Sequence, residues 1–395
     1  MILLFGFGLV LLGVMFLNKK RVKTEKILFP FVYMVLYRTK IGLLLMDKIA
    51  KRHSKLVKIF ATFGVMFSFL GMIAIFFLLV RGTYGFLFAG APPPVAPLFP
   101  GVKAVPGLPV LSFFHWIIAI FILAGVHEFS HGLVARLYNV KVKSSGFAVF
   151  SFLLPIIPAA FVEPDEKELG SKKFGEQLGV LGAGSFSNLI TAGVFFLLFM
   201  FVMAPIISGM TISEGVIIRD VNRDGPAFNA GVEKDEKILT VNEINISSVE
   251  GFLGILTDLK PGDEILLATN KSEYRLVAGD NDGKGYLGLS FSPEKQYVDE
   301  KYGLLGRFFS WSALLFFWIF AANLGVGLFN LLPMGPLDGG KMFYLVCLNL
   351  FKKENVAKKV WIFVSLFCLM LIIISLAPFF GKLLNFIFGI FVGLF

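Results

Sequence analysis

Two histidines and a glutamate inside an apolar segment are the residues of this 395-residue chain whose types and spacing suggest chemistry. The segment 111–137 contains the run His127-Glu128-Phe129-Ser130-His131. Residues four apart on a helix lie on the same face, so both imidazoles can reach one metal ion. Glu128 follows the first histidine directly, where a carboxylate can take a proton from water beside that ion. The spacing therefore predicts a hydrolytic metal site.

A third ligand is needed, because catalytic zinc sites take three side chains and leave one position open. His115 would lie about three turns before His127 on the same helix, so a carboxylate is the better candidate. Asp338 is the only acid in the apolar stretch 308–346, and prolines before it and glycines after it interrupt the helix. A turn aspartate is the alternative interpretation of such a segment. Beside paired histidines, we expect Asp338 to be the third ligand.

The composition places these residues in a membrane protein. The chain is 56% apolar, 15% aromatic and only 16% charged, whereas soluble chains average about 25% charged residues. Ionisable groups are energetically costly inside membrane spans, and there they usually mark function. The net charge of +10 fits basic cytoplasmic loops, so we expect no nucleic-acid partner.

Apolar runs predict the membrane spans. They cover residues 2–17, 59–80, 111–137, 178–205, 304–332 and 360–376. Basic residues concentrated between 19 and 58 predict that this part is cytoplasmic and that the proline-rich stretch 82–109 is an outside loop. Residues 27–45 are expected to form an interfacial helix or a hairpin. The pattern leaves open whether 27–45 and 379–395 cross the bilayer.

Residues 144–168 are apolar, strand-like and broken by prolines. Because buried backbone groups need partners, we expect a hairpin or strand that dips into the protein beside the metal site; an ordinary buried loop is the alternative. A free edge of this segment can pair with an extended substrate, with Gly146, Phe147 and Val149 as candidate contacts. In the following span, small residues predict close helix packing. Asn188 is expected either to line the site or to bond a neighbouring helix.

The composition changes near residue 208, and residues 213–292 are polar with strand alternation and turns. The pattern GPAFNAGV, DEKILTVNE and LKPGDEI within this segment resembles a PDZ domain. The resemblance implies an inserted β-rich domain, and the count of spans predicts that it lies on the extracytoplasmic side.

The motif residues together resemble the site-2 protease family of intramembrane zinc metalloproteases, in its PDZ-containing branch. The residues that carry the likeness are His127 to His131, Asn330-Leu331-Leu332-Pro333 and Leu337-Asp338-Gly339, with 146–165 and 182–188 similar to the family's membrane-dipping β segment and its glycine/asparagine loop. The resemblance implies Zn²⁺ held by His127, His131 and Asp338, with Glu128 as general base. It also implies that Asn330 helps to hold the substrate or the reaction intermediate. The implied activity is regulated intramembrane proteolysis of single-span or already trimmed membrane proteins.

The predicted fold is a multi-span α-helical membrane protein with an inserted β-rich PDZ domain and a membrane-dipping β segment. Its parts are an N-terminal region (1–110), a first core part (111–206), the PDZ domain (211–292) and a second core part with the C-terminal spans (304–395). We expect a multi-pass cell-membrane protein in contact with lipid and with transmembrane substrates, its active site towards the cytoplasm. A metal transporter and an inactive PDZ-presenting scaffold are the competing interpretations. Convergence on a single site and the intact His, Glu and Asp set favour the enzyme.

Overall fold

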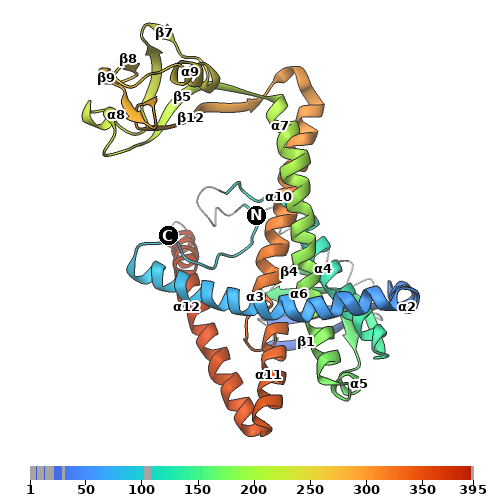
Figure 1. The fold of residues 1–395 in the computed structure, drawn as a ribbon. Coiled ribbons are helices and arrows are strands. Elements are labelled where there is room, and N and C mark those ends of the chain that lie inside the picture. The colour runs from blue at the N-terminus through green and yellow to red at the C-terminus, as the bar shows by residue number, and fades with distance from the viewer. Residues whose placement is uncertain are drawn as a thin grey trace. The chain divides into compact units, whose positions relative to one another are not determined.

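The computed structural model describes residues 22–28, 32–101, 108–152 and 154–392, together with Gly6 and Gly13. Side chains are described from Val35 onwards, except at 150–158 and 382–392. The predicted span at 2–17 lies outside these residues. The chain divides into two compact units, 1–199 with 314–395, and 200–313 (Figure 1).

The elements of the first unit are β1 (Val22–Leu28), β2 (Val32–Thr39), α2 (Leu43–Arg52), α3 (Ser54–Phe88), α4 (Phe113–Leu137), β3 (Val142–Phe152), β4 (Leu154–Pro164), α5 (Glu166–Gly170), α6 (Phe174–Leu198), α11 (Asp338–Phe351) and α12 (Glu354–Val392). Helix α10 (Gly303–Phe329) begins in the second unit and ends in the first. Residues 379–392, whose conformation the sequence leaves open, continue α12 beyond Pro378.

Five helical segments of the described chain are long and apolar enough to cross a membrane. They are Ser54–Phe88, Phe113–Leu137, Phe174–Met210, Glu300–Phe329 and Glu354–Gly381. Each overlaps a predicted span, which confirms a multi-pass helical membrane protein. Helix α3 starts earlier than the predicted 59–80, because Lys55 and Lys58 near its beginning can extend their charged ends towards water.

Small residues allow α6 to approach α3 closely, as the sequence predicts. A Cβ atom at Gly182 would lie 2.9 Å from the Ser68 hydroxyl oxygen and 3.2 Å from the Gly64 carbonyl oxygen. The Ser68 hydroxyl donates a hydrogen bond to the Gly182 carbonyl at 3.3 Å. Larger side chains would separate the helices, so these positions fix how near α6 lies to its neighbours. Buried side chains of α3, α4 and α6 join in one core around Ala61, Val134 and Ala183.

The described strands β1 to β4 form an antiparallel sheet in chain order. The sheet confirms the hairpin expected within 144–168 and the hairpin alternative for the start of 27–45, where a strand hairpin is followed by α2. Strand β2 pairs with β3 along its length, with Val32 opposite Phe152 and Thr39 opposite Ser145. Strand β3 has no free edge, because β2 and β4 occupy both its sides. The candidate pairing of substrate with residues 146–152 is therefore wrong, whereas β4, in the same segment, is the last strand of the described sheet.

The second unit combines a short helical part with a β-rich part that has its own core. Its elements are η2 (Phe199–Met203, shared with the first unit), α7 (Ala204–Met210), β5 (Thr211–Val221), α8 (Pro226–Asn229), β6 (Lys237–Val241), β7 (Ile244–Asn245), α9 (Val249–Thr257), β8 (Glu264–Thr269), β9 (Glu273–Val277), β10 (Gly279–Asn281), β11 (Lys284–Tyr286), β12 (Leu289–Val298) and η3 (Glu300–Tyr302). The main sheet has the order β12-β5-β6-β8-β9. Ile218, Ile238 and Leu267 of these strands are fully buried in one core with Phe252 of α9.

Candidate metal centre

Three side chains from two helices meet in the first unit. His127 and His131 lie one turn apart on α4, and Asp338 is the first residue of α11. The two Nε2 atoms are 3.1 Å apart, and the Asp338 Oδ2 atom is 3.2 Å from that of His127 and 3.1 Å from that of His131. The three side chains are only 10–12% exposed. Two imidazoles and a carboxylate thus converge on one point inside the protein.

Glycines bring Asp338 to this point. The Gly339 N–H donates to the Asn330 carbonyl at 2.8 Å, which ties the start of α11 to the turn after α10. A Cβ atom at Gly339 would collide with the backbone of Leu331, and one at Gly340 would lie 2.5 Å from the Met334 carbonyl oxygen. Only glycine allows such close backbone approach, so the sequence after Asp338 sets the depth of its carboxylate.

The outer nitrogens of both imidazoles contact α6. His131 Nδ1 lies 2.7 Å from the Val180 carbonyl oxygen, and His127 Nδ1 lies 3.2 Å from the Asn188 side-chain amide. Asn188 is completely buried. It lies beside His127, which is itself on the neighbouring helix α4, so this contact fits both alternatives for Asn188. These contacts hold the ring planes so that both Nε2 atoms point towards Asp338.

The donor set fits a tetrahedral zinc ion. Ligand distances of about 2.0–2.1 Å with tetrahedral angles separate the donor atoms by about 3.3 Å, and the three observed separations are 3.1–3.2 Å. A Cβ atom at Gly184 of α6 would lie 2.8 Å from the Nε2 atom of His127 and closer still to that of His131. Glycine therefore leaves open the space that an ion bound to both nitrogens requires.

Glu128 lies beside the three donors. Its Oε2 atom accepts a hydrogen bond from the Val162 N–H of β4 at 2.8 Å. The carboxylate also interacts electrostatically with His131. The sheet thus fixes the orientation of Glu128, a contact that the sequence does not predict.

The remaining candidate contacts lie in the sheet and in the turn after α10. Phe147 is 44% exposed, and its ring meets Phe121 of α4 edge-on at 6.1 Å. Val149 is buried, and a Cβ atom at Gly146 would collide with the Tyr37 carbonyl of β2. Gly146 therefore permits the β2–β3 pairing. The Asn330 backbone carbonyl supports the start of α11, as described above.

Three groups that shape the site were not predicted from the sequence: Gly184, the Val180 carbonyl and the Val162 N–H. Gly184 falls within the small-residue segment 182–188, so a signal for it was present. The two backbone groups have no side-chain signature. They are found only when the partner of each imidazole or carboxylate is traced in three dimensions.

The fold and the site define a multi-pass membrane protein with a largely buried His-His-Asp group whose ligand atoms are close enough to hold a metal ion. The model of peptidase family M50 matches residues 115–372. The chain is 30% identical over 317 residues to an uncharacterized protein of Methanocaldococcus jannaschii, covering 76% of this chain and 74% of that protein.

Two further relatives carry functional names. A putative zinc metalloprotease of Clostridium perfringens is 23% identical over 62% of this chain and 85% of its own length. The zinc metalloprotease RasP of Shouchella clausii is 23% identical over 49% of this chain and 56% of its own length. The chain belongs to peptidase family M50, the site-2 protease family. It is a zinc metalloprotease, and its cofactor is Zn²⁺.

Proposed function

We propose that this enzyme hydrolyses peptide bonds within or beside the membrane span of single-span or already trimmed membrane proteins. In this proposal His127, His131 and Asp338 hold the zinc ion, and Glu128 is the general base. The observation that carries the proposal is the convergence of three buried donor atoms, 3.1–3.2 Å apart, in a unit built from candidate membrane spans.

The contacts around the imidazoles support their role as neutral ligands. An imidazole that binds through Nε2 carries its proton on Nδ1, and that proton needs an acceptor. The Val180 carbonyl accepts it from His131. For His127 the structure places the Asn188 amide nitrogen at 3.2 Å from Nδ1, while the amide oxygen is buried without a partner. The two amide atoms exchange by a half-turn of the side chain, and in our proposal the oxygen takes the position facing Nδ1 and accepts its proton. Asn188 is thus a positioning residue for the ligand His127.

Glu128 moves the proton in the proposed reaction. Zn²⁺, when bound, supplies a Lewis acid that polarises the scissile carbonyl and acidifies water. Glu128 takes the proton of the attacking water and delivers it to the leaving amine. The Val162 N–H holds the carboxylate beside the three donors while it does so.

The substrate must be extended at the cleaved bond, because a helix hides its carbonyls in internal hydrogen bonds. Strand β3 offers no free edge, so we propose that substrate contact comes from the side of the sheet that faces α4. The exposed Phe147 beside Phe121 provides an apolar surface there. Gly146, Val149 and Asn330 shape this region, and helix-breaking residues in a substrate would favour its unwinding.

The placement of the parts across the membrane is also a proposal. Exposed basic residues lie along α2 and the first turns of α3, near the end of α4 that carries Arg136. Basic loops favour the cytoplasm, so we propose that the metal centre opens towards that side. The β-rich part of the second unit is then the extracytoplasmic, PDZ-like domain. We propose that it excludes substrates that still carry a bulky ectodomain.

The competing functions lack equivalent support. A metal transporter would move its ion along a series of sites, whereas here a general base candidate lies beside a single three-donor group. An inactive scaffold would have no use for Glu128 held by the Val162 N–H. Both remain separable from the protease by experiment, because neither predicts peptide products.

The test uses purified full-length enzyme in liposomes with a single-span reporter, and mass spectrometry identifies the products. We expect cleavage within or beside the span, its loss on zinc chelation, and a decrease of at least about 100-fold in Glu128→Gln. Glu166→Gln, the same change at an exposed residue of α5, serves as the control. Undiminished turnover in Glu128→Gln would remove this residue from its role.

The filter is tested separately by deleting residues 213–292. The shortened enzyme is expected to cleave a reporter with a large folded ectodomain that the full chain refuses. Continued refusal, with the trimmed reporter still cleaved, would assign the exclusion to another part of the protein.

A further inference from the structure

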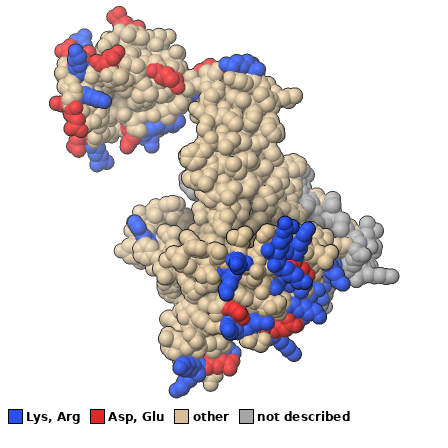
Figure 2. Space-filling view, turned by 45° about the vertical axis from the view of Figure 1, so that its right-hand side comes forward, with Lys and Arg blue, Asp and Glu red and all other residues tan. Residues whose placement is uncertain are grey.

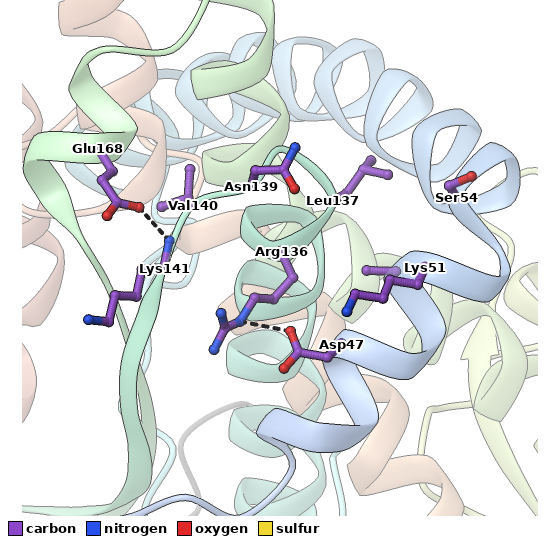
Figure 3. Close-up of a pocket in the computed structure, with 10 residues that line it drawn as sticks. Asp47, Lys51, Ser54, Arg136, Leu137, Asn139, Val140, Lys141 and Glu168 are labelled. Atoms are coloured by element: carbon purple, nitrogen blue, oxygen red, sulfur yellow. Dashed lines mark hydrogen bonds and ion pairs between the residues drawn. The ribbon is translucent and has the colours of Figure 1, made fainter.

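A pocket of 470 Å³ lies in the first unit where α3 begins and α4 ends, separate from the three metal donors (Figure 3). Lys51 of α2, Ser54 of α3, Arg136 of α4 and Lys141 line it, together with Asp47 and Glu168. Its volume lies within the range of about 300–1,000 Å³ in which small-ligand sites fall.

The two carboxylates of the pocket are already engaged. Asp47 Oδ1 lies 3.2 Å from Arg136 Nε, and Glu168 Oε2 accepts a hydrogen bond from the Lys141 N–H at 2.7 Å. Among the residues that the structure describes, neither Lys51 nor Lys141 has an ion-pair partner for its ammonium group. Arg136 and Asp47 offset one another, and the other charged residues of the lining are Lys51, Lys141 and Glu168, which leave a net charge of +1. This balance favours an anion over a cation.

The backbone adds to this preference. Ser54 is the first residue of the 35-residue helix α3, and the first turn of this helix contains no acidic side chain. The N-terminus of a helix carries a partial positive charge and N–H groups without helical partners. Ser54 at the start of α3 lines the same pocket as Lys51 and Lys141, and phosphate oxygens are suitable acceptors for N–H groups at a helix start.

We propose that this pocket binds the phosphate group of an anionic phospholipid. Helices α3 and α4 are candidate membrane spans, and the pocket lies where one begins and the other ends. In the membrane placement proposed above, on which this inference rests, that position lies at the depth of lipid headgroups, where basic pockets between membrane helices hold anionic lipids. Arg136 contributes guanidinium N–H groups beyond those directed to Asp47 and to the Val142 carbonyl.

The surface around the pocket supports a lipid as the source of the phosphate. Exposed lysines and arginines follow one another at positions 48, 51, 52, 55 and 58. Figure 2 shows Lys and Arg side chains gathered near one end of the first unit, next to a broad surface without charged side chains. Such a boundary between apolar and basic surface is typical of a protein that contacts acyl chains and anionic headgroups together.

The proposed ligand site shares a helix with the metal centre. Arg136 lies five residues after His131 on α4, and Asp47 of α2 pairs with Arg136. A bound headgroup restrains the end of α4 and its contact with α2. The enzyme is then expected to be most stable in bilayers that contain anionic lipid.

The test measures lipid retained by the purified full-length protein in native mass spectrometry, with phosphatidylglycerol or phosphatidylcholine added in detergent. The pocket variant is Lys51→Gln with Lys141→Gln. The control is Lys55→Gln with Lys58→Gln, which removes the same charge from exposed positions that do not line the pocket. We expect phosphatidylglycerol to bind about tenfold more weakly to the pocket variant and within about twofold of wild type in the control.

Further arms separate the outcomes. Lys51→Arg with Lys141→Arg should restore binding, and the thermal unfolding of each variant in phosphatidylcholine establishes that it is folded. Glycerol phosphate added without lipid distinguishes a soluble phosphate ester from a lipid headgroup: displacement of the lipid by it would assign the pocket to soluble ligands and overturn the lipid proposal. Equal loss of phosphatidylglycerol in the pocket and control variants would show general surface attraction, and would also overturn it.

Discussion

Adding one methyl group at Gly184 tests whether the zinc ion lies between the two imidazoles. In Gly184→Ala the new Cβ would lie 2.8 Å from the Nε2 and Cε1 atoms of His127, and nearer to the Nε2 atom of His131. Neither ring is a freely moving chain end, because His131 is held by the Val180 carbonyl and His127 by Asn188. The substitution therefore competes directly with the ion for space between the two imidazoles.

The expected magnitude follows from these distances. Ordinary van der Waals contact needs about 3.5 Å, so the rings or α6 must move by about 1 Å. Overpacking of this kind costs about 1–3 kcal/mol of stability. Loss of an outer partner alone weakens metal binding about 10- to 100-fold. Displacement of both ligand rings should therefore lower zinc affinity by at least about 100-fold, which corresponds to about 2.7 kcal/mol.

The assay is competition for zinc between the purified protein and a chelator of known affinity, followed by elemental analysis. Gly193→Ala is the matched control, because it is on the same helix and its Cβ would have no atom within 4 Å. The control should bind zinc like the wild type. Wild-type zinc affinity in Gly184→Ala would refute the position inferred for the ion.

Three further predictions concern the contacts around the site and the second unit. Asn188→Leu keeps the approximate volume of the side chain but removes the acceptor for His127, so zinc affinity in the same competition assay should fall about 10- to 100-fold. Asn188→Asp keeps an acceptor, so its zinc affinity should fall less. Equal zinc affinity in the wild type and both variants would contradict the positioning role. Val162→Pro removes the N–H that holds Glu128, so turnover should fall at least about tenfold at unchanged zinc content. Loss of zinc from this variant would show that the substitution disturbs the metal ligands, which contradicts a contact that acts on Glu128 alone. Glu236 is fully buried and accepts from the Thr269 and Tyr274 hydroxyls at 2.5 and 2.9 Å; Glu236→Ala should destabilise the second unit by about 2–4 kcal/mol in denaturant unfolding, and Glu233→Ala, on an exposed side chain, by less than about 0.5 kcal/mol.

The helices and the three metal donors could be predicted because their signals are local and strong. A membrane span needs a long apolar run, and each such run in the described chain became a helix. Inside these runs His127, His131 and Asp338 are costly without a shared partner, so their meeting could be expected even though 207 residues separate His131 from Asp338.

The sheet partner of β3 could not be predicted in the same way. Strand β2 begins more than 100 residues before β3. The sequence of an apolar strand does not indicate which distant strand will pair with its N–H and C=O groups. The sequence therefore indicated the hairpin of β3 and β4 but not which of the two strands is the edge: β2 pairs with β3, and β4 ends the described sheet. Once β2 occupies that side, substrate pairing with residues 146–152 is excluded.

The contacts that orient the site were missed for a related reason. The Val180 carbonyl and the Val162 N–H act through the backbone, which is the same at every non-proline position. Gly184 differs, because absence of a side chain is visible in the sequence. The reason for glycine at this position is clear only from the structure, in which a Cβ atom would collide with the two imidazoles.

The central claim is that His127, His131 and Asp338 share one zinc ion. The most direct measurement is the zinc content and affinity of purified Asp338→Ala, compared with the wild type and with Asp258→Ala at an exposed residue of the second unit. The wild type and the control should each hold one zinc ion per chain, whereas Asp338→Ala should lose most of it at the same free zinc concentration. One tightly bound zinc ion in Asp338→Ala, with wild-type affinity, would contradict the account.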